Sequence, residues 1–169
     1  IEPPGTGDPL RQWRLLKDGT SVWWQVQSRN KRSLALDLKD LAAVAIVRRL
    51  ALEADVLVEN FRPGALDRLG LSYESLAETN PRLIYASEKG FLPGPYEERT
   101  ALDEVAQMMG GLAYMTGPSG RPLRAGTSVV DIVGGMFGAF GTVLALKQRD
   151  KTGKGGLVES ALFESVVFL

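Results

Sequence analysis

Asp131 is the residue in this sequence that is best placed to do covalent chemistry. It opens a glycine-rich, apolar stretch, residues 131–149, whose pattern predicts a helix. One interpretation is a nucleophile for an activated electrophile, kept ionised by the positive end of the helix and given room by the neighbouring glycines. The other is an N-cap, a position that Asp strongly favours. On the residues alone both stay open, and the cap is preferred as the simpler of the two.

A second set of candidate ligand-binding residues follows the apolar run at residues 55–59. Phe61 could stack on a ring and Arg68 could reach a phosphate, while backbone amides near Asn60 would assist. The alternative is an ordinary turn with Pro63 at the first position of a helix. Spacing alone leaves the turn as the commoner explanation.

Composition restricts the chemistry further. The 169 residues contain no Cys and no His, which excludes thiolate nucleophiles, Ser–His pairs and Cys- or His-based metal sites in this segment, and no metal is expected. Lys plus Arg and Asp plus Glu number 20 each, and this balance argues against a nucleic-acid binder. The length suits one domain of average size with a real core.

The first half of the sequence alternates between apolar segments typical of strands and segments with helical spacing. The expected strands are residues 33–38, 55–59 and 82–87, and the expected helices are 40–54, capped by Asp40, 63–69, and 72–79, capped by Ser72. The strands are too apolar for one solvated face, so their order predicts βαβ units around a buried parallel sheet, an α/β fold. In such sheets ligands lie at the carboxyl ends of the strands, here near Lys39, Phe61 and Lys89.

The second half predicts fewer and longer elements. We expect a helix at 100–115, in which Thr100 is the N-cap and the helix dipole alone explains Asp103, and then a loop at 116–126. After the helix at 131–149 we expect a strand at 157–160 and a further helix. The uncharged run in the long helix covers 15 residues, Ile132 to Leu146. A membrane span needs about 20, so a buried helix of a soluble protein is expected.

Taken in order, several motifs resemble those of family III CoA-transferases, which include formyl-CoA and carnitine CoA-transferases and the related α-methylacyl-CoA racemases. The motifs are residues 1–8 (IEPPGTGD), 30–39 (NKRSLALDLK), 55–64 (DVLVENFRPG) with 69–71 (LGL), 80–87 (NPRLIYAS) with Gly90, Asp103 with Gln107, and 151–155 (KTGKG). Each motif is modest alone, but the ordered set covers essentially the whole chain. The sequence is therefore identified as a member of this family.

The resemblance implies a Rossmann-like parallel sheet with flanking helices. Residues 1–169 would form a single CoA-binding α/β segment of the family's large domain, with N-terminal elements, the small domain and the C-terminal part missing. A start without Met and an apolar end are also expected of an incomplete chain. Full-length members form interlocked homodimers, and we expect a cytoplasmic protein without nucleic-acid or membrane partners.

The resemblance also implies the site. Residues 126–131 (GTSVVD) match the pattern before the family's catalytic aspartate, which makes Asp131 the expected nucleophile as well as a cap. It would attack an acyl-CoA and pass CoA to a carboxylic-acid acceptor through an aspartyl-CoA thioester. The substrate that carries CoA would be held by residues at matching family positions: Leu36, Lys39, Asn60, Phe61, Arg68 and Asp103.

Two alternatives remain beside the transferase. The related racemases place a His before the Asp that matches Asp103, and Leu102 stands there in this chain. Because moving an α-proton needs a titratable group on each face of the carbon, racemase activity is disfavoured. Thr100 and Leu102 also replace a Lys and a Tyr of the formyl-CoA enzyme, so CoA contacts from these two side chains are not carried over. The other alternative is a CoA-binding fragment without activity.

Overall fold

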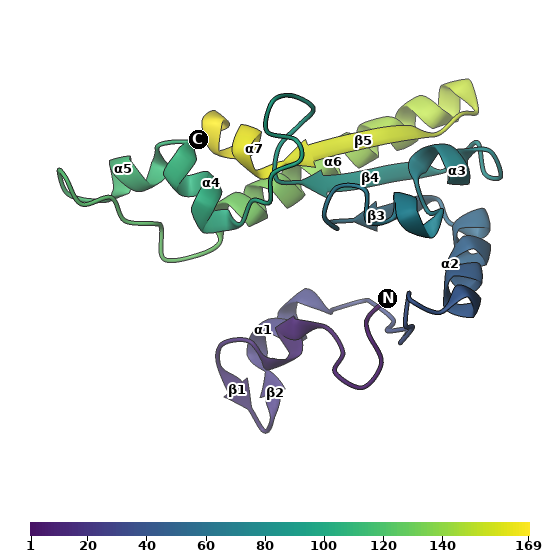
Figure 1. The fold of residues 1–169 in the computed structure, drawn as a ribbon, viewed down its shortest axis with the longest axis horizontal. Coiled ribbons are helices and arrows are strands. Elements are labelled where there is room, and N and C mark those ends of the chain that lie inside the picture. The colour runs from purple at the N-terminus through teal and green to yellow at the C-terminus, as the bar shows by residue number, and fades with distance from the viewer. The chain divides into compact units, whose positions relative to one another are not determined.

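The computed structural model describes residues 1–169, which divide into two compact units, Ile1–Val47 and Arg48–Leu169. Figure 1 shows their elements, and each unit is described by itself below. The second unit holds the parallel sheet and Asp131.

The first unit consists of short elements around a small hairpin. These are η1 (Pro9–Gln12), β1 (Leu16–Lys17), β2 (Thr20–Ser21), α1 (Val22–Gln27) and the start of α2 (Leu41–Glu53). The predicted strand at residues 33–38 is wrong, since only Ala35 forms an isolated parallel bridge, to Glu2. Its alternating leucines have no sheet to cover, and Leu34 remains 40% exposed.

One buried carboxylate organises the first unit. Glu2 accepts hydrogen bonds from the backbone N–H of Asp8 at 2.7 Å, from Arg11 Nε at 2.7 Å and Arg11 Nη2 at 2.6 Å, and from the Ser33 hydroxyl. These bonds, with Arg11 first, hold the pKa of Glu2 far below its usual range. Glu2 therefore joins the start of the chain to the segment before α2.

Helix α2 begins where the sequence predicts. The Asp40 carboxylate accepts a hydrogen bond from the backbone N–H of Ala42 at 2.9 Å, which satisfies one of the free donors of the first turn. Within the second unit, Arg48 of this helix donates to the Gly70 carbonyl and to the Ser75 hydroxyl. These bonds fix the helix against the segment that follows the first strand of the sheet.

The second unit is built on three parallel strands in the order β3–β4–β5, which confirms the predicted α/β class. They are β3 (Val56–Glu59), β4 (Ile84–Lys89) and β5 (Gly156–Ala161). The central strand β4 has both neighbours and is buried from Ile84 to Ser87, as expected for a parallel sheet with covered faces.

The helices of the second unit connect these strands. They are η2 (Asp67–Leu69), α3 (Tyr73–Ala77), α4 (Asp103–Met109), α5 (Leu112–Thr116), α6 (Val129–Thr152) and α7 (Leu162–Phe168). The single helix expected at 100–115 is interrupted at Gly110–Gly111, where Gly111 adopts a φ of +87° that helices do not allow. Its predicted cap, Thr100, is also wrong, because Leu102 precedes the first helical turn.

Helix α6 lies along one face of the sheet, behind β4 and β5 in Figure 1, and runs opposite to the strands. Near its start the Gly134 carbonyl accepts a 2.7 Å hydrogen bond from Ser160 Oγ, close to the carboxyl end of β5. Near its end Arg149 forms a 2.7 Å ion pair with Asp55 and bonds to the Asp55 and Arg82 carbonyls, which precede β3 and β4. The first turn of α6 therefore lies at the carboxyl edge of the sheet.

The two faces of α6 differ in burial. Gly134 and Gly138 are buried, whereas Met136, Phe140 and Val143 are all more than 60% exposed. By length and composition alone the helix could cross a membrane, and 17% of its most apolar 18-residue window is buried. The expectation of a buried helix is thus wrong except for the glycine face, because no other part of this chain covers the opposite face.

Candidate functional site

Asp131 is the third residue of α6, and its side chain is exposed at the carboxyl edge of the sheet. The helix begins two residues earlier than predicted, and Ser128 occupies the N-cap position. The cap interpretation of Asp131 is therefore wrong. Its carboxylate stands beside the first helical turn, where the positive end of the helix dipole favours negative charge.

The first turn of α6 is capped by a side chain from another helix. Asp103, the first residue of α4, accepts hydrogen bonds from the backbone N–H groups of Val130 at 2.8 Å and Asp131 at 3.3 Å. Its other oxygen accepts from Gln107 Nε2 at 2.5 Å and from Arg124 Nη2 at 3.3 Å. At 7% exposure, this carboxylate holds the backbone that carries Asp131.

The surroundings raise the pKa of the Asp131 carboxyl. Loss of solvation by neighbouring atoms is the main cause, and the nearby Asp103 carboxylate adds to it, while Ser128 and Arg124 act in the opposite direction. A carboxylate with a raised pKa is a stronger base and a better nucleophile once it is ionised. It also becomes protonated at a higher pH than an ordinary Asp.

Replacing Asp103 with asparagine is expected to destabilise the second unit by about 1–3 kcal/mol, because a neutral amide cannot accept from α6 and from Gln107 and Arg124 together. Thermal unfolding of the full-length protein measures the effect. Glu104→Gln is the matched control. Glu104 is 54% exposed and pairs only with Arg124, so its loss should change stability by no more than about 0.5 kcal/mol. Equal effects of the two variants would contradict the capping role.

A pocket of ≈ 220 Å³ lies over the sheet face that carries Tyr85 and Lys89 of β4 and Leu157 of β5, and it reaches the carboxyl end of β3 at Glu59. Phe61, Tyr73 and Tyr85 supply aromatic surface to it. Its walls carry four acidic side chains, Glu59, Asp67, Glu74 and Glu159, and two basic ones, Arg62 and Lys89. This acidic excess suits an uncharged portion of a ligand better than a phosphate.

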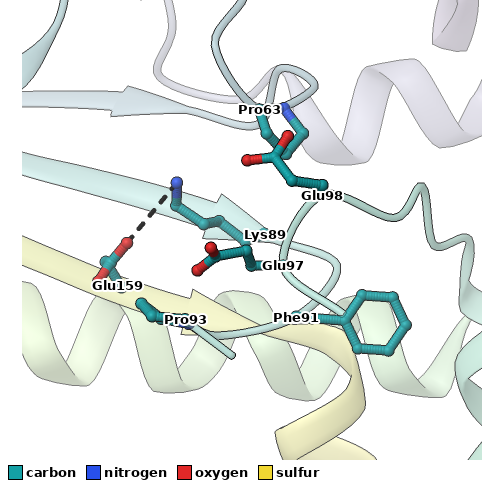
Figure 2. Close-up of a pocket in the computed structure, with 7 residues that line it drawn as sticks. All are labelled: Pro63, Lys89, Phe91, Pro93, Glu97, Glu98 and Glu159. Carbon is teal, nitrogen blue, oxygen red and sulfur yellow. Dashed lines mark ion pairs between the residues drawn. The ribbon is translucent and has the colours of Figure 1, made fainter. Parts of the chain in front are cut away.

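A smaller pocket of ≈ 70 Å³ adjoins it and is shown in Figure 2. Lys89, at the end of β4, forms a 3.6 Å ion pair with Glu159 of β5 across its floor. Glu97 and Glu98 come from the loop after β4, and Phe91 lies at one side. The pair holds Lys89 at the strand ends, within the wall that both pockets share.

Comparison with known proteins identifies the family. The model of CoA-transferase family III matches residues 1–169. The chain belongs to CoA-transferase family III. It is 40% identical over 172 residues to the succinyl-CoA–D-citramalate CoA-transferase of Chloroflexus aurantiacus, covering 100% of this chain and 43% of that protein. It is 44% identical over 170 residues to the acetyl-CoA:oxalate CoA-transferase of Acetobacter aceti, covering 99% and 44%.

The solved structures agree with this family and with the α/β fold. A CAIB/BAIF family protein from Brucella suis superposes with a TM-score of 0.92 and 39% identity, over 99% of this chain and 46% of that one. The chain thus spans less than half the length of the family III proteins it matches. The expected sheet with flanking helices is confirmed.

The residues that the resemblance assigned to CoA lie in both units. Leu36, which is half-buried, and Lys39, which is exposed, belong to the first unit. In the second unit, Asn60 and Phe61 directly follow β3 and Arg68 lies in η2, and all three are exposed. Of these three, only Phe61 lines the larger pocket. Its backbone N–H donates to Glu59 Oε2 at 2.8 Å, which fixes the turn at the strand end.

Other residues at the site were not assigned a role from the sequence. Gln107, noted only as part of a motif, is fully buried beside Asp103. Lys89 is the last residue of β4, and Glu159 lies within β5. The strand end was a signal for Lys89, whereas no sequence signal selected Glu159. Arg124 pairs with Asp103 and Glu104 at 3.3 Å each. The structure gathers no group of three Asp, Glu, His or Cys side chains suited to a metal ion.

Proposed function

We propose that the protein containing this chain transfers CoA from an acyl-CoA to a carboxylic acid, with Asp131 as the nucleophile. The observation that carries the proposal is the exposed Asp131 carboxylate in the first turn of α6, on a backbone held by Asp103. Its raised pKa supports the same role, as does its place at the carboxyl edge of the sheet, where ligands of parallel α/β folds generally bind. The curated relatives named above are CoA-transferases.

The reaction proceeds by four acyl transfers. Asp131 attacks the thioester carbonyl of the donor, forming an aspartyl-acyl anhydride and releasing the CoA thiolate. The thiolate attacks the aspartyl carbonyl, which gives an aspartyl-CoA thioester and frees the donor acid as a carboxylate. The acceptor carboxylate attacks that thioester and expels the thiolate, leaving a new anhydride. The thiolate then attacks the acceptor carbonyl, which forms the new acyl-CoA and regenerates Asp131. Dividing one exchange into these steps is the advantage of covalent catalysis.

We propose that CoA is held by the residues at matching family positions, which are Leu36, Lys39, Asn60, Phe61 and Arg68. Because the pocket beside Phe61 is acidic, its aromatic wall suits the adenine or the pantetheine arm, and the exposed Arg68 and Lys39 suit the phosphates. Asp103 was included among these residues, and its buried bonds to α6 favour a role in supporting Asp131 instead.

The names of the relatives support a proposal for the acceptor class. Oxalate and D-citramalate, named for the two curated relatives, are both dicarboxylic acids, so we propose a dicarboxylate acceptor. We further propose that the full-length protein is a cytoplasmic homodimer without a resident metal. In the full-length homodimer, other parts of the protein would cover the apolar face of α6 that is exposed in this chain. A covered helix is consistent with membership of a transferase family.

Trapping with hydroxylamine tests the proposal. The full-length protein is incubated with succinyl-CoA, acetyl-CoA or formyl-CoA, treated with hydroxylamine, digested and analysed by mass spectrometry. A hydroxamate at Asp131 that depends on the acyl-CoA is expected, because both the anhydride and the thioester react with hydroxylamine. Folded protein that gives no label with any thioester would contradict the nucleophile.

A second candidate applies to the 169 residues alone. Because they span less than half of their relatives, the isolated chain is better described as a CoA-binding segment without turnover. Calorimetry with CoA and an activity assay on the same sample distinguish the two functions. Racemase activity is not proposed, because the exposed side chain before Asp103 is Leu102, which cannot move a proton.

A further inference from the structure

Gln107 is a fully buried polar side chain close to Asp131. It lies on α4, four residues after Asp103, so both side chains project from the same face of the helix. A buried amide that lacks partners is costly, and this one uses both of its ends. Its Nε2 donates to Asp103 Oδ1 at 2.5 Å and to the Thr127 carbonyl at 3.5 Å, and its Oε1 accepts from the backbone N–H of Ala125 at 2.7 Å.

These partners belong to the segment that leads directly into α6. Ala125 and Thr127 precede the N-cap residue Ser128, and Asp131 follows in the first turn. One end of the amide therefore holds the backbone before the helix. The other end orients the carboxylate that accepts from the helix N–H groups. Gln107 is thus the side chain that joins the two supports of Asp131.

We infer that Gln107 is a positioning residue for Asp131, acting through Asp103 and the residues 125–127 segment rather than by touching substrate. The inference rests on the proposed role of Asp131 as nucleophile. Small displacements of an attacking group are costly in rate, about 10²-fold for an error of about 1 Å. A side chain that fixes the backbone on both sides of the entry to α6 therefore affects the chemical step more than the binding of acyl-CoA.

The chemistry of this position requires a neutral amide. Methionine fills similar space but can neither donate to Asp103 nor accept from Ala125. Glutamate keeps the acceptor for Ala125 and, when ionised, places a second carboxylate against Asp103, whose oxygen lies 2.5 Å from the amide nitrogen. A protonated glutamate restores a donor to Asp103. Methionine therefore removes the bonds at both ends of the amide, whereas glutamate removes only those of the donor, and only while it is ionised.

The test compares Gln107→Met and Gln107→Glu with Gln148→Met in the full-length protein. Gln148 is exposed near the end of α6, and its side chain has no hydrogen-bond partner. We expect Gln107→Met to lower kcat per folded molecule by about 10–100-fold, with KM for acyl-CoA within about twofold. Hydroxamate formation at Asp131 should slow in parallel, and Gln148→Met should behave as the wild type. The activity of Gln107→Glu relative to wild type should rise as the pH falls.

Three outcomes would overturn the inference. The first is unchanged kcat and labelling rate in Gln107→Met. The second is a loss that disappears when activity is divided by the folded fraction, measured by near-UV circular dichroism. The third is a Gln107→Glu activity that stays as low as that of Gln107→Met when the pH falls. Wild-type protein without any hydroxamate at Asp131 would instead contradict the proposed function, and this inference with it, so the two failures are distinguishable.

Discussion

Asp131→Asn in the full-length protein is expected to abolish CoA transfer, with a loss in kcat of at least about 10⁴-fold, while Asp150→Asn leaves the rate unchanged. Asparagine has nearly the same size and shape as aspartate, but its amide cannot form the anhydride or the thioester. The exposed position of Asp131 means that no buried partner is lost. Steady-state transfer between an acyl-CoA and a dicarboxylate measures the effect.

Asp150 is a suitable control because it lies on the same helix, is exposed, and makes no ion pair or side-chain hydrogen bond. CoA binding, followed by calorimetry, should be similar in both variants, since the lesion lies in the chemical step. Asp131→Ala is included as a second variant, because slow deamidation of Asn to Asp would restore activity in Asp131→Asn. Transfer at more than a hundredth of the wild-type rate in both Asp131 variants would show that another group carries the acyl chain.

The same substitution has an expected signature in stability. The pKa of Asp131 is raised in the folded protein, so folding favours the protonated carboxyl and loses stability as the pH rises through that pKa. Asp131→Asn removes this cost. The variant should therefore unfold at a higher temperature than the wild type near neutral pH, and the difference should vanish as the pH falls below the pKa of the unfolded carboxyl.

Gly155→Ala is expected to destabilise the second unit by about 3 kcal/mol, near the upper end for single substitutions. A Cβ at residue 155 would lie 2.0 Å from the Leu83 carbonyl oxygen and 2.6 Å from the Arg82 carbonyl carbon. Both are backbone atoms just before β4, so relief requires moving the backbone rather than rotating a side chain. In a domain of this size the loss corresponds to a fall of about 6–12 °C in the unfolding midpoint.

The neighbouring Gly156→Ala provides the control. A Cβ there would have no atom within 4 Å, although both residues donate backbone hydrogen bonds to the segment before β4, Gly155 to Pro81 and Gly156 to Leu83. Its unfolding midpoint should stay within about 2 °C of the wild type. If both variants unfold at the same temperature, the close approach at Gly155 has no energetic importance.

The sequence was sufficient to predict the three strands of the sheet. It was not sufficient to exclude a strand at 33–38 or to predict the break in the helix at Gly110–Gly111. Each of β3, β4 and β5 contains a short run of apolar residues, so all three strands were detectable. The segment at 33–38 has a strand pattern without a second strand to pair with, and pairing is not a local property. The break at Gly110–Gly111 was missed because the apolar spacing continues across it and only the φ of Gly111 ends the helix.

In the candidate site, too, one feature was predictable from the sequence and another was not. Asp131 was selected first by its residue type beside glycines and then by the family pattern that precedes it. Its support could not be inferred, because Asp103 reaches the N–H of Val130 across 27 residues of sequence. A local reading assigned Asp103 to the dipole of its own helix. The structure shows that one of its oxygens accepts hydrogen bonds from the first turn of α6, and only the folded arrangement reveals this.

The bonds of Arg149 near the C-terminal end of α6 limit the insertions that the helix can tolerate. Arg149 is bound to backbone before β3 and β4, and Asp131 lies about five turns away, on the same side of the helix. An inserted residue between them would rotate one end by about 100° and shift it by about 1.5 Å relative to the other. Either Arg149 would leave its carbonyls or Asp131 would turn away from Asp103. The number of residues between Arg149 and Asp131 therefore determines where the Asp131 carboxylate lies relative to the strand ends and in which direction it points.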